Sequence, residues 1–310
     1  MSAFTPILRQ VARLAAGMAL AALLVASAAA AEGEDEDQNR PNFPTTEFTE
    51  GAKTASVTVG DVTATVVMER RAEIDQGADV PVLQVTVAGQ KVLEAPGVSS
   101  GFDQPVAEAS IAEVDPDNHH QEVYFSSYSG GAHCCNTVLV AEEEGDHWIT
   151  VPIGEFDGDG NYLEDLDGDG LAEIVTVDNR FLYQFDCYAC SAAPLMITTV
   201  RGGAKQDITS EPRFMAAHRD WLQQLEGNVE PVDRWTSPGF LAGWVAAKIR
   251  IGEGADAWKG LTSHWNLAKD EAEEVCLTGG EPESCPKKQR AKLKFPDRLK
   301  LFLDQNGYRF

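Results

Sequence analysis

One stretch of this chain, residues 165–175, spaces its carboxylates as a calcium-binding loop does. It reads Asp-Leu-Asp-Gly-Asp-Gly-Leu-Ala-Glu-Ile-Val. Such a loop binds Ca²⁺ through side-chain oxygens at positions 1, 3, 5 and 9 and a backbone carbonyl at position 7, with glycine at the bend. The residues at these five positions are Asp165, Asp167, Asp169, Leu171 and Glu173. The sequence therefore predicts calcium as the cofactor of this segment.

The residues after the loop indicate a strand rather than the helix of an EF-hand. Position 12 is Thr176 instead of a bidentate glutamate, and the run Glu-Ile-Val-Thr-Val is rich in β-branched side chains. In this the segment resembles the aspartate-rich loops of FG-GAP and VCBS repeats, which sit on β-hairpins of integrin-type propellers. The resemblance implies a hairpin calcium site. The alternative is a metal-free Asp/Gly-rich turn, which leaves the clustered carboxylates without a compensating cation.

A degenerate copy of the loop begins 52 residues earlier, where Glu-Val-Asp-Pro-Asp-Asn-His-His-Gln-Glu-Val aligns without a gap. Its ligand positions fall on Glu113, Asp115, Asp117 and Gln121. Pro116 and the neutral Gln121 predict a weaker or empty site, although Asn118 tolerates the conformation of the glycine it replaces. A third oxygen cluster directly upstream of the main loop consists of Asp157, Asp159 and Asn161. It predicts either an adjacent second ion or one ion shared with the main loop.

Cysteines form the second chemical feature of the chain. The six residues are Cys134, Cys135, Cys187, Cys190, Cys276 and Cys285. An even number in an exported chain predicts disulfides. Because adjacent cysteines close a strained ring poorly, we expect crossed bridges between the 134/135 and 187/190 pairs, and a separate bridge from Cys276 to Cys285. Two alternatives are a redox pair at Cys187 and Cys190, and a soft-metal site at His133 with its neighbouring cysteines.

The N-terminus predicts export. Arg9 and Arg13 precede an uncharged run that ends in Ala-Ala-Ala, which is typical of a cleaved signal peptide over residues 1–31; the alternative is an uncleaved anchor. We therefore expect a periplasmic or secreted protein without membrane insertion after cleavage. The whole chain has a net charge of −24, and removal of the signal peptide takes away two arginines and no acid. This charge argues against nucleic acid as a partner.

A basic C-terminal segment departs from the acidic composition. Residues 285–310 contain eight lysines and arginines against two aspartates, a net charge of +6. Such a segment usually docks on its own acidic body. The sharper hypothesis is that it contacts an anionic envelope polymer or a protein partner.

Composition and periodicity divide the rest of the chain and predict an α+β fold. Residues 32–46 are expected to form an acidic disordered leader. Residues 47–212 show short β patterns, including one at 181–185, and predict a sandwich or a partial propeller with two repeats. Residues 213–310 are predicted to be helical, with helices near 212–225, 254–260, 263–275 and 287–305. A further helix is capped by Ser237 and has Pro238 in its first turn.

A wider resemblance joins these motifs. Gly-Gly-Ala-His-Cys-Cys between two aspartate-rich loops, followed by Asp178-Asn-Arg-Phe and a Cys-x-x-Cys element, resembles a group of exported bacterial proteins of unknown function. We expect an exported calcium-binding protein that acts as a binding or structural module of the cell envelope. One alternative is a calcium-dependent envelope hydrolase using Glu155 or Glu164 with His133, and another is a thiol-redox protein. The sequence contains no nucleophile elbow, zinc motif or phosphate loop, which favours binding over catalysis.

Overall fold

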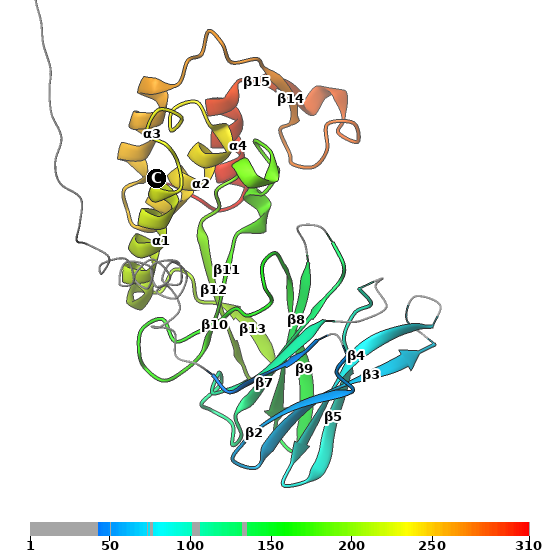
Figure 1. The fold of residues 1–310 in the computed structure, drawn as a ribbon. Coiled ribbons are helices and arrows are strands. Elements are labelled where there is room, and N and C mark those ends of the chain that lie inside the picture. The colour runs from blue at the N-terminus through cyan, green and yellow to red at the C-terminus, as the bar shows by residue number, and fades with distance from the viewer. Residues whose placement is uncertain are drawn as a thin grey trace, which may run out of the picture. The chain divides into compact units, whose positions relative to one another are not determined.

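Alternating β-branched and small residues in the first two thirds of the chain produce antiparallel strands, and a change to helical periodicity follows them (Figure 1). The computed structural model describes residues 43–309, apart from residues 50, 73, 75–76, 101–105 and 132–134. The expected signal peptide and most of the leader lie outside the described residues, and so do His133 and Cys134. Strands followed by a helical region confirm the α+β class.

The first sheet is a four-stranded antiparallel meander with the order β2-β3-β4-β5. Its strands are β2 (Thr54–Val59), β3 (Val62–Arg71), β4 (Ala78–Val87) and β5 (Gln90–Pro96). The first turn of the meander is the two-residue hairpin Gly60-Asp61, and Gly60 has the positive φ of 59° that the turn needs.

The second sheet has five strands in the order β1-β6-β7-β8-β9 and packs against the first. Its strands are β1 (Thr45–Phe48), β6 (Ala107–Ala112), β7 (Glu122–Tyr128), β8 (Asn136–Glu144) and β9 (His147–Phe156). Val66 and Leu83 of the first sheet share one buried core with Ile111 and Phe125 of the second. Thr45 and Thr46, assigned to the leader from sequence, pair with β6 in β1.

The third sheet has the order β10-β11-β12-β13 and covers the opposite face of the second sheet. Its strands are β10 (Leu163–Glu164), β11 (Glu173–Val177), β12 (Leu195–Arg201) and β13 (Ala204–Asp207). Tyr124 and Val140 from the second sheet pack with Ile174 and Val200 from the third. This arrangement brings the β6–β7 connection close to the β10–β11 connection, since the amide of Ala172 donates to the carbonyl of Glu113 at 2.7 Å.

Helices form the C-terminal core. They are α1 (Met215–Gly227), α2 (Pro238–Arg250), α3 (Gly254–His264) and α4 (Phe295–Gln305). The predicted start of α2 is confirmed, because Ser237 Oγ accepts a hydrogen bond from the Phe240 amide at 3.4 Å and Pro238 opens the helix. Leu241, Leu261 and Leu299 meet in the interior of this cluster, and Phe181 joins them from the segment after β11.

Two secondary-structure predictions are wrong, and the helix expected near 287–305 is only partly right, because residues 290–293 form a strand and α4 begins at Phe295. Residues 181–185 do not form a strand; a short 3₁₀ turn, η1 (Asn179–Phe181), directs Phe181 into the helical core instead. Residues 263–275 do not form a helix, because α3 ends at His264 and β14 (Glu273–Cys276) pairs with β15 (Arg290–Leu293). Among the residues that the structure describes, no helix combines the length and apolar character needed to cross a membrane.

Candidate metal centre

The main aspartate-rich loop connects β10 to β11, whose register pairs Glu164 with Glu173. Its first acid, Asp165, organises the turn. Asp165 Oδ1 accepts hydrogen bonds from the amides of Gly168 at 2.8 Å and Asp169 at 3.1 Å, and Oδ2 accepts one from Gly170 at 3.0 Å. The loop therefore leads into a strand as predicted, and its own backbone amides fix the orientation of its first carboxylate.

The other acids are held in the same way. Asp167 Oδ1 accepts from the Asp169 amide at 3.2 Å, and Asp169 Oδ1 accepts from the Leu171 amide at 2.8 Å. Glu173 Oε2 accepts from the amide of Leu166 at 2.9 Å. Each of these three acids therefore has one oxygen fixed by the loop backbone and one oxygen that no loop amide holds. Leu171 was expected to offer its carbonyl to the ion. The hydrogen bond that Leu171 makes in the loop is through its amide, which donates to Asp169 Oδ1.

The carboxylates converge on a common point. Asp165, Asp167 and Glu173 each offer one oxygen, and these oxygens lie within 4.8 Å of one another. A cationic side chain from a distant part of the chain lies at the same place: Arg213 Nη1 is 3.0 Å from Asp167 Oδ2, 3.0 Å from Asp169 Oδ2 and 3.7 Å from Glu173 Oε1. The sequence analysis did not anticipate this arginine, because nothing in the local spacing of the loop indicates it.

Arg213 is positioned by the turn that precedes α1, η3 (Pro212–Phe214). Its guanidinium stacks over the ring of Phe214, with 4.4 Å to the ring centroid, and its Nε donates to Glu211 at 2.8 Å. Phe214 is fully buried, and the loop residue Leu166 packs against the same apolar cluster. Packing therefore brings the arginine to the loop, and the ion pairs complete the contact.

Glu173 differs from the other acids because it is buried, with 2% of its surface exposed. The pKa of its carboxyl is raised to about 7, chiefly by burial and also by the neighbouring Asp167, whereas the Leu166 amide and Arg213 act in the opposite direction. Carboxylate oxygens are the donors that Ca²⁺ prefers. An ion at this point would meet oxygen donors that the loop has already oriented, so the residues present fit a calcium ion, provided that Arg213 moves or shares the site.

The first loop has the same hairpin construction but not the predicted alignment. The register pairs Ala112 with Glu122 at its base, so residues 113–121 form the connection, whereas residues 165–172 form that of the main loop. The first loop is thus one residue longer, and Glu122 rather than Gln121 corresponds to Glu173. The gapless alignment that gave Gln121 its ligand position does not match this register, because it cannot represent the extra residue.

Glu122 takes the same structural role as Glu173. It is fully buried, and its Oε2 accepts from the amides of Val114 at 2.6 Å and Asp115 at 2.9 Å, while Oε1 accepts from Asn118 Nδ2 at 2.6 Å. Burial raises the pKa of its carboxyl to about 7, and these hydrogen bonds oppose the shift. A glutamate at the first residue of the strand after each loop was the available signal in the sequence.

The remaining acids of the first loop do not converge as those of the main loop do. Asp115 is 2% exposed, and its Oδ2 accepts from the Gly202 amide at 2.7 Å. Arg201 lies beside it, with Nε 4.0 Å from Asp115 Oδ1, and also donates to the Val114 carbonyl. Asp117 is exposed, whereas Glu113 is half-buried and burial raises the pKa of its carboxyl.

Glu142 on β8 is an acid near this loop that the sequence analysis missed. Its side chain is fully buried, and neither carboxylate oxygen has a hydrogen-bond partner among the residues that the structure describes. Burial raises the pKa of its carboxyl, and the charge of Asp115 raises it further; the Gly203 amide is near enough to offset part of this shift without reaching hydrogen-bond geometry. The sequence contains little indication of this, because Glu142 lies within a strand pattern in which a glutamate is usually exposed.

Comparison with known proteins places the chain in a family. Residues 218–307 match the model of the sll0997 C-terminal domain. Over 253 residues, 80% of this chain and 74% of the relative, it is 35% identical to the probable thylakoid lumen protein sll0997 of Synechocystis sp.. The chain belongs to the sll0997 family. It is also 32% identical to the uncharacterized protein y4bJ of Sinorhizobium fredii over 214 residues, which are 68% of this chain and 34% of y4bJ. No solved structure matches it.

In this member of the sll0997 family, the matched C-terminal segment begins within α1, after Arg213 and after both aspartate-rich loops. The third oxygen cluster, between β9 and β10, also lies before it. Asp159 Oδ1 accepts from the Asn161 amide at 3.1 Å, and the Asp157 carbonyl accepts from Tyr162 Oη at 2.7 Å. Within the described ranges these two aspartates do not join a third acid, histidine or cysteine in one donor group.

The catalytic candidates lie only in part within the described residues. Glu155 is exposed on β9, and its carbonyl accepts a hydrogen bond from Asn179 Nδ2 at 2.9 Å. Glu164 lies on β10 opposite Glu173. His133, the candidate base, falls outside the described residues.

One cysteine prediction is confirmed and one is wrong. Cys276 pairs with Cys285 as expected. The crossed pairing is wrong, because Cys187 pairs with Cys190 across a 3₁₀ turn, η2 (Tyr188–Cys190). The Cα atoms of the two residues lie 5.0 Å apart. Cys135 is also in a disulfide, and Cys134 lies outside the described residues.

The basic C-terminal segment divides its charges between its own body and solvent. Arg290 pairs with Glu274 at 3.6 Å, and Arg298 pairs with Glu273. Four lysines of the same segment have exposed side chains. They are Lys287, Lys288, Lys292 and Lys300.

Proposed function

We propose that this protein is an exported calcium-binding module in which the Asp165–Glu173 loop binds the ion. The observation that carries the proposal is the convergence of Asp165, Asp167 and Glu173 around a point that a cationic nitrogen already approaches. A cluster of carboxylates held this close requires positive charge. Its resemblance to the hairpin loops of FG-GAP and VCBS repeats favours calcium as the cation.

Magnesium fits this site less well than calcium. Magnesium demands near-octahedral geometry and gives up its water reluctantly, whereas calcium accepts irregular cages of carboxylate and carbonyl oxygens. The main loop supplies such a cage from Asp165, Asp167, Asp169 and Glu173, with the Leu171 carbonyl as the expected fifth donor. The first loop is the weaker site of the proposal, because Asp117 points to solvent and Arg201 lies beside Asp115.

A structural or binding role fits the position of the loop. Calcium at the β10–β11 connection would fix the hairpin and the adjoining Leu166, which packs on the same cluster as Phe214 before α1. The ion would therefore stabilise the junction between the third sheet and the helices. The Synechocystis relative is named as a lumen protein, and a lumen, like the periplasm, is reached by export; this supports an exported location for the module.

Calcium titration followed by thermal and chemical unfolding tests the proposal. At free calcium about one hundred times the Kd, binding should raise the free energy of unfolding by about 2.7 kcal/mol. Asp167→Asn should remove most of this gain, since it keeps the side-chain shape and deletes one ligand charge. Asp146→Asn, at a fully exposed aspartate of the β8–β9 turn, is the matched control and should keep it.

Two results would contradict the proposal. One is an unfolding free energy that does not change with calcium in the wild-type protein. The other is an equal response to calcium in Asp167→Asn and Asp146→Asn, which would assign the binding to general surface charge. An equal response to magnesium and calcium would argue against the calcium preference of the loop.

A further inference from the structure

We propose that Cys187–Cys190 is a redox-active disulfide that exchanges with a dithiol reductant, independently of the calcium loop. Both cysteines are exposed, and both lie in the connection between β11 and β12, residues 178–194, rather than inside a sheet or a helix core. Thiol–disulfide exchange requires a thiolate to reach one sulfur along the disulfide axis, so solvent access is its first condition.

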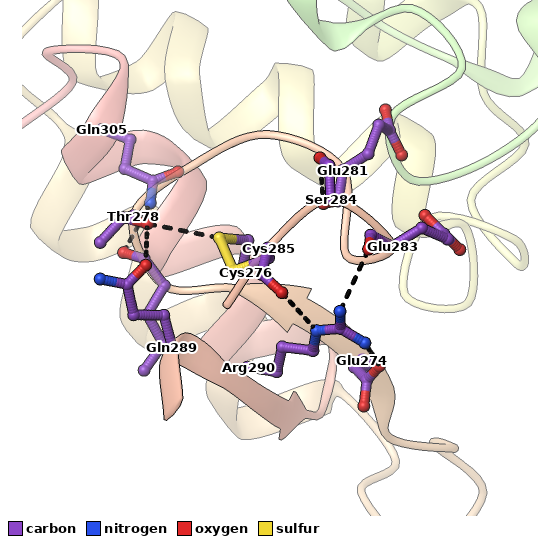
Figure 2. Close-up of a disulfide and its surroundings, with 11 residues drawn as sticks. Glu274, Cys276, Thr278, Glu281, Glu283, Ser284, Cys285, Gln289, Arg290 and Gln305 are labelled. Carbon is purple, nitrogen blue, oxygen red and sulfur yellow. Dashed lines mark hydrogen bonds and ion pairs between the residues drawn. A yellow bond between two sulfur atoms is a disulfide. The ribbon is translucent and has the colours of Figure 1, made fainter. Parts of the chain in front are cut away.

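The chain contains an internal comparison for this property. Cys276 and Cys285 are buried, with 6% and 5% of their surfaces exposed. Figure 2 shows their disulfide enclosed by the loop that joins β14 to β15: Thr278 Oγ1 lies 3.3 Å from Cys276 Sγ, and Arg290 Nε donates to the Cys285 carbonyl at 2.8 Å. This second disulfide is placed as a structural crosslink, so the two bridges should differ in reactivity.

The turn around the exposed disulfide has bonds that do not depend on the sulfurs. The Cys190 amide donates to the Cys187 carbonyl at 3.0 Å, and Ser191 Oγ donates to the same carbonyl at 2.9 Å. Reduction therefore leaves a hydrogen-bonded turn that holds the two thiols near each other. This is the condition for reversible closure, because the effective concentration of one thiol at the other stays high.

The same segment contacts the first turns of α2. The Ala192 amide donates to the Gly239 carbonyl at 3.2 Å, and a Cβ built at Gly239 would lie 2.5 Å from the Cys190 carbonyl oxygen. Backbone thus packs on backbone with no side chain between them. A change in the disulfide turn would be transmitted to the start of α2, and the redox state would be linked to this helix contact.

Asp186 sets the electrostatics of the site. One of its oxygens and the two sulfurs lie within 4.8 Å of one another, and Asp186 Oδ1 accepts from the Cys187 amide at 2.8 Å. A carboxylate beside the sulfurs repels an attacking thiolate. The site should therefore react faster with a dithiol of neutral or positive charge than with an anionic one, and Asp186→Asn should reduce this discrimination.

The exchange balances without any further reactant. One thiolate of the dithiol attacks an exposed sulfur, a mixed disulfide forms, and the other cysteine leaves as a thiolate that takes up a proton. The second thiol of the reductant loses its proton and attacks its own sulfur in the mixed disulfide, which releases the remaining cysteine. The protein gains two electrons and two protons, and the dithiol becomes a disulfide.

Timed reduction of the native full-length protein tests the proposal. Dithiothreitol is the neutral probe, alkylation stops the reaction, and peptide mass analysis reads each bridge separately. Cys187–Cys190 should open at least about tenfold faster than Cys276–Cys285, and unfolding in urea should bring the two rates within about threefold of each other. Oxidised dithiothreitol added after removal of the reductant should close the bridge again.

The Asp186→Asn variant tests whether the charge beside the sulfurs affects the reduction of Cys187–Cys190 alone. With an anionic dithiol such as dimercaptosuccinate, the variant should open Cys187–Cys190 about threefold faster than the wild type does, with no change at Cys276–Cys285. Equal rates for the two bridges in the native protein would overturn the proposal. So would a bridge that opens only under conditions that unfold the chain, or one that does not close again. Calcium binding enters none of these measurements.

Discussion

Replacement of Arg213 by glutamine is the perturbation that most directly separates this guanidinium from the proposed calcium ion at the main loop. The arginine supplies positive charge at 3.0 Å from Asp167 and Asp169 and at 3.7 Å from Glu173. If calcium uses the same carboxylates, the arginine and the ion compete. The variant should therefore be less stable than the wild type without calcium, and it should bind calcium more tightly.

The magnitudes follow from exposure and distance. The Arg213 side chain is 32% exposed, so solvent screens its ion pairs, and we expect a loss of about 1 kcal/mol in the calcium-free state. A unit charge near a bound ion in such a partly screened site changes its binding free energy by a similar amount, about 1.4 kcal/mol, or about tenfold in Kd. With saturating calcium, the variant should recover much of its lost stability.

Isothermal calorimetry gives the Kd, and urea unfolding with and without calcium gives the two stabilities. Arg71→Gln is the matched control, because Arg71 pairs with Glu69 at 2.7 Å and Glu94 at 2.5 Å on the first sheet. It should lower stability slightly and leave the Kd unchanged. A Kd in Arg213→Gln that equals or exceeds the wild-type value would refute the competition, because removing a competing positive charge cannot weaken a cation site.

Three further outcomes follow from the structure. Burial raises the pKa of Glu108 to about 7, above its unfolded value near 4.5, so between these pH values the folded protein binds more protons than the unfolded chain does. The free energy of unfolding should therefore fall from pH 4.5 to 7. Urea unfolding at several pH values should show that Glu108→Gln reduces this fall by about 1–2 kcal/mol. Gly239→Ala should lower the free energy of unfolding by about 1–3 kcal/mol and lower the melting temperature, because its Cβ would lie 2.5 Å from the Cys190 carbonyl oxygen. Gly227→Ala should not lower the melting temperature, because nothing lies within 4 Å of the Cβ built there. Glu122→Ala should lower the free energy of unfolding in urea by about 2–4 kcal/mol, because it leaves two buried amides without an acceptor. A loss below about 0.5 kcal/mol, the size of a neutral surface substitution, would contradict the structural role of Glu122.

Local features of the main loop could be predicted from sequence. The spacing of Asp165, Asp167 and Asp169 dictates which backbone amides each carboxylate meets, and the β-branched run after Glu173 determines that a strand follows. The cap of α2 at Ser237 is local in the same sense. In each case the interacting groups lie within a few residues of one another, so the spacing alone carries the information.

Interactions between distant residues could not be predicted in this way. Arg213 reaches the loop from 40 residues past Glu173, and only the packing of Phe214 and Leu166 brings it there. Glu122 was missed because an insertion of one residue is invisible to a gapless alignment, although strand register reveals it. The pairing of Cys187 with Cys190 was only an alternative, because crossed bridges were preferred from the ring strain of adjacent cysteines, and that argument does not describe how residues 188 and 189 fold.

The two loops together suggest why the acids and their cation are encoded differently. Each loop is closed by a buried glutamate at the first residue of the following strand, and each receives an arginine from further along the chain, Arg201 for the first and Arg213 for the second. In the main loop, amides of the same loop hold the acids, so their positions depend on local backbone. The arginine arrives only when the downstream packing is complete, so it compensates the acids in the folded chain alone. Calcium would compensate them at any stage, which predicts that the ion stabilises the hairpin before the helices dock.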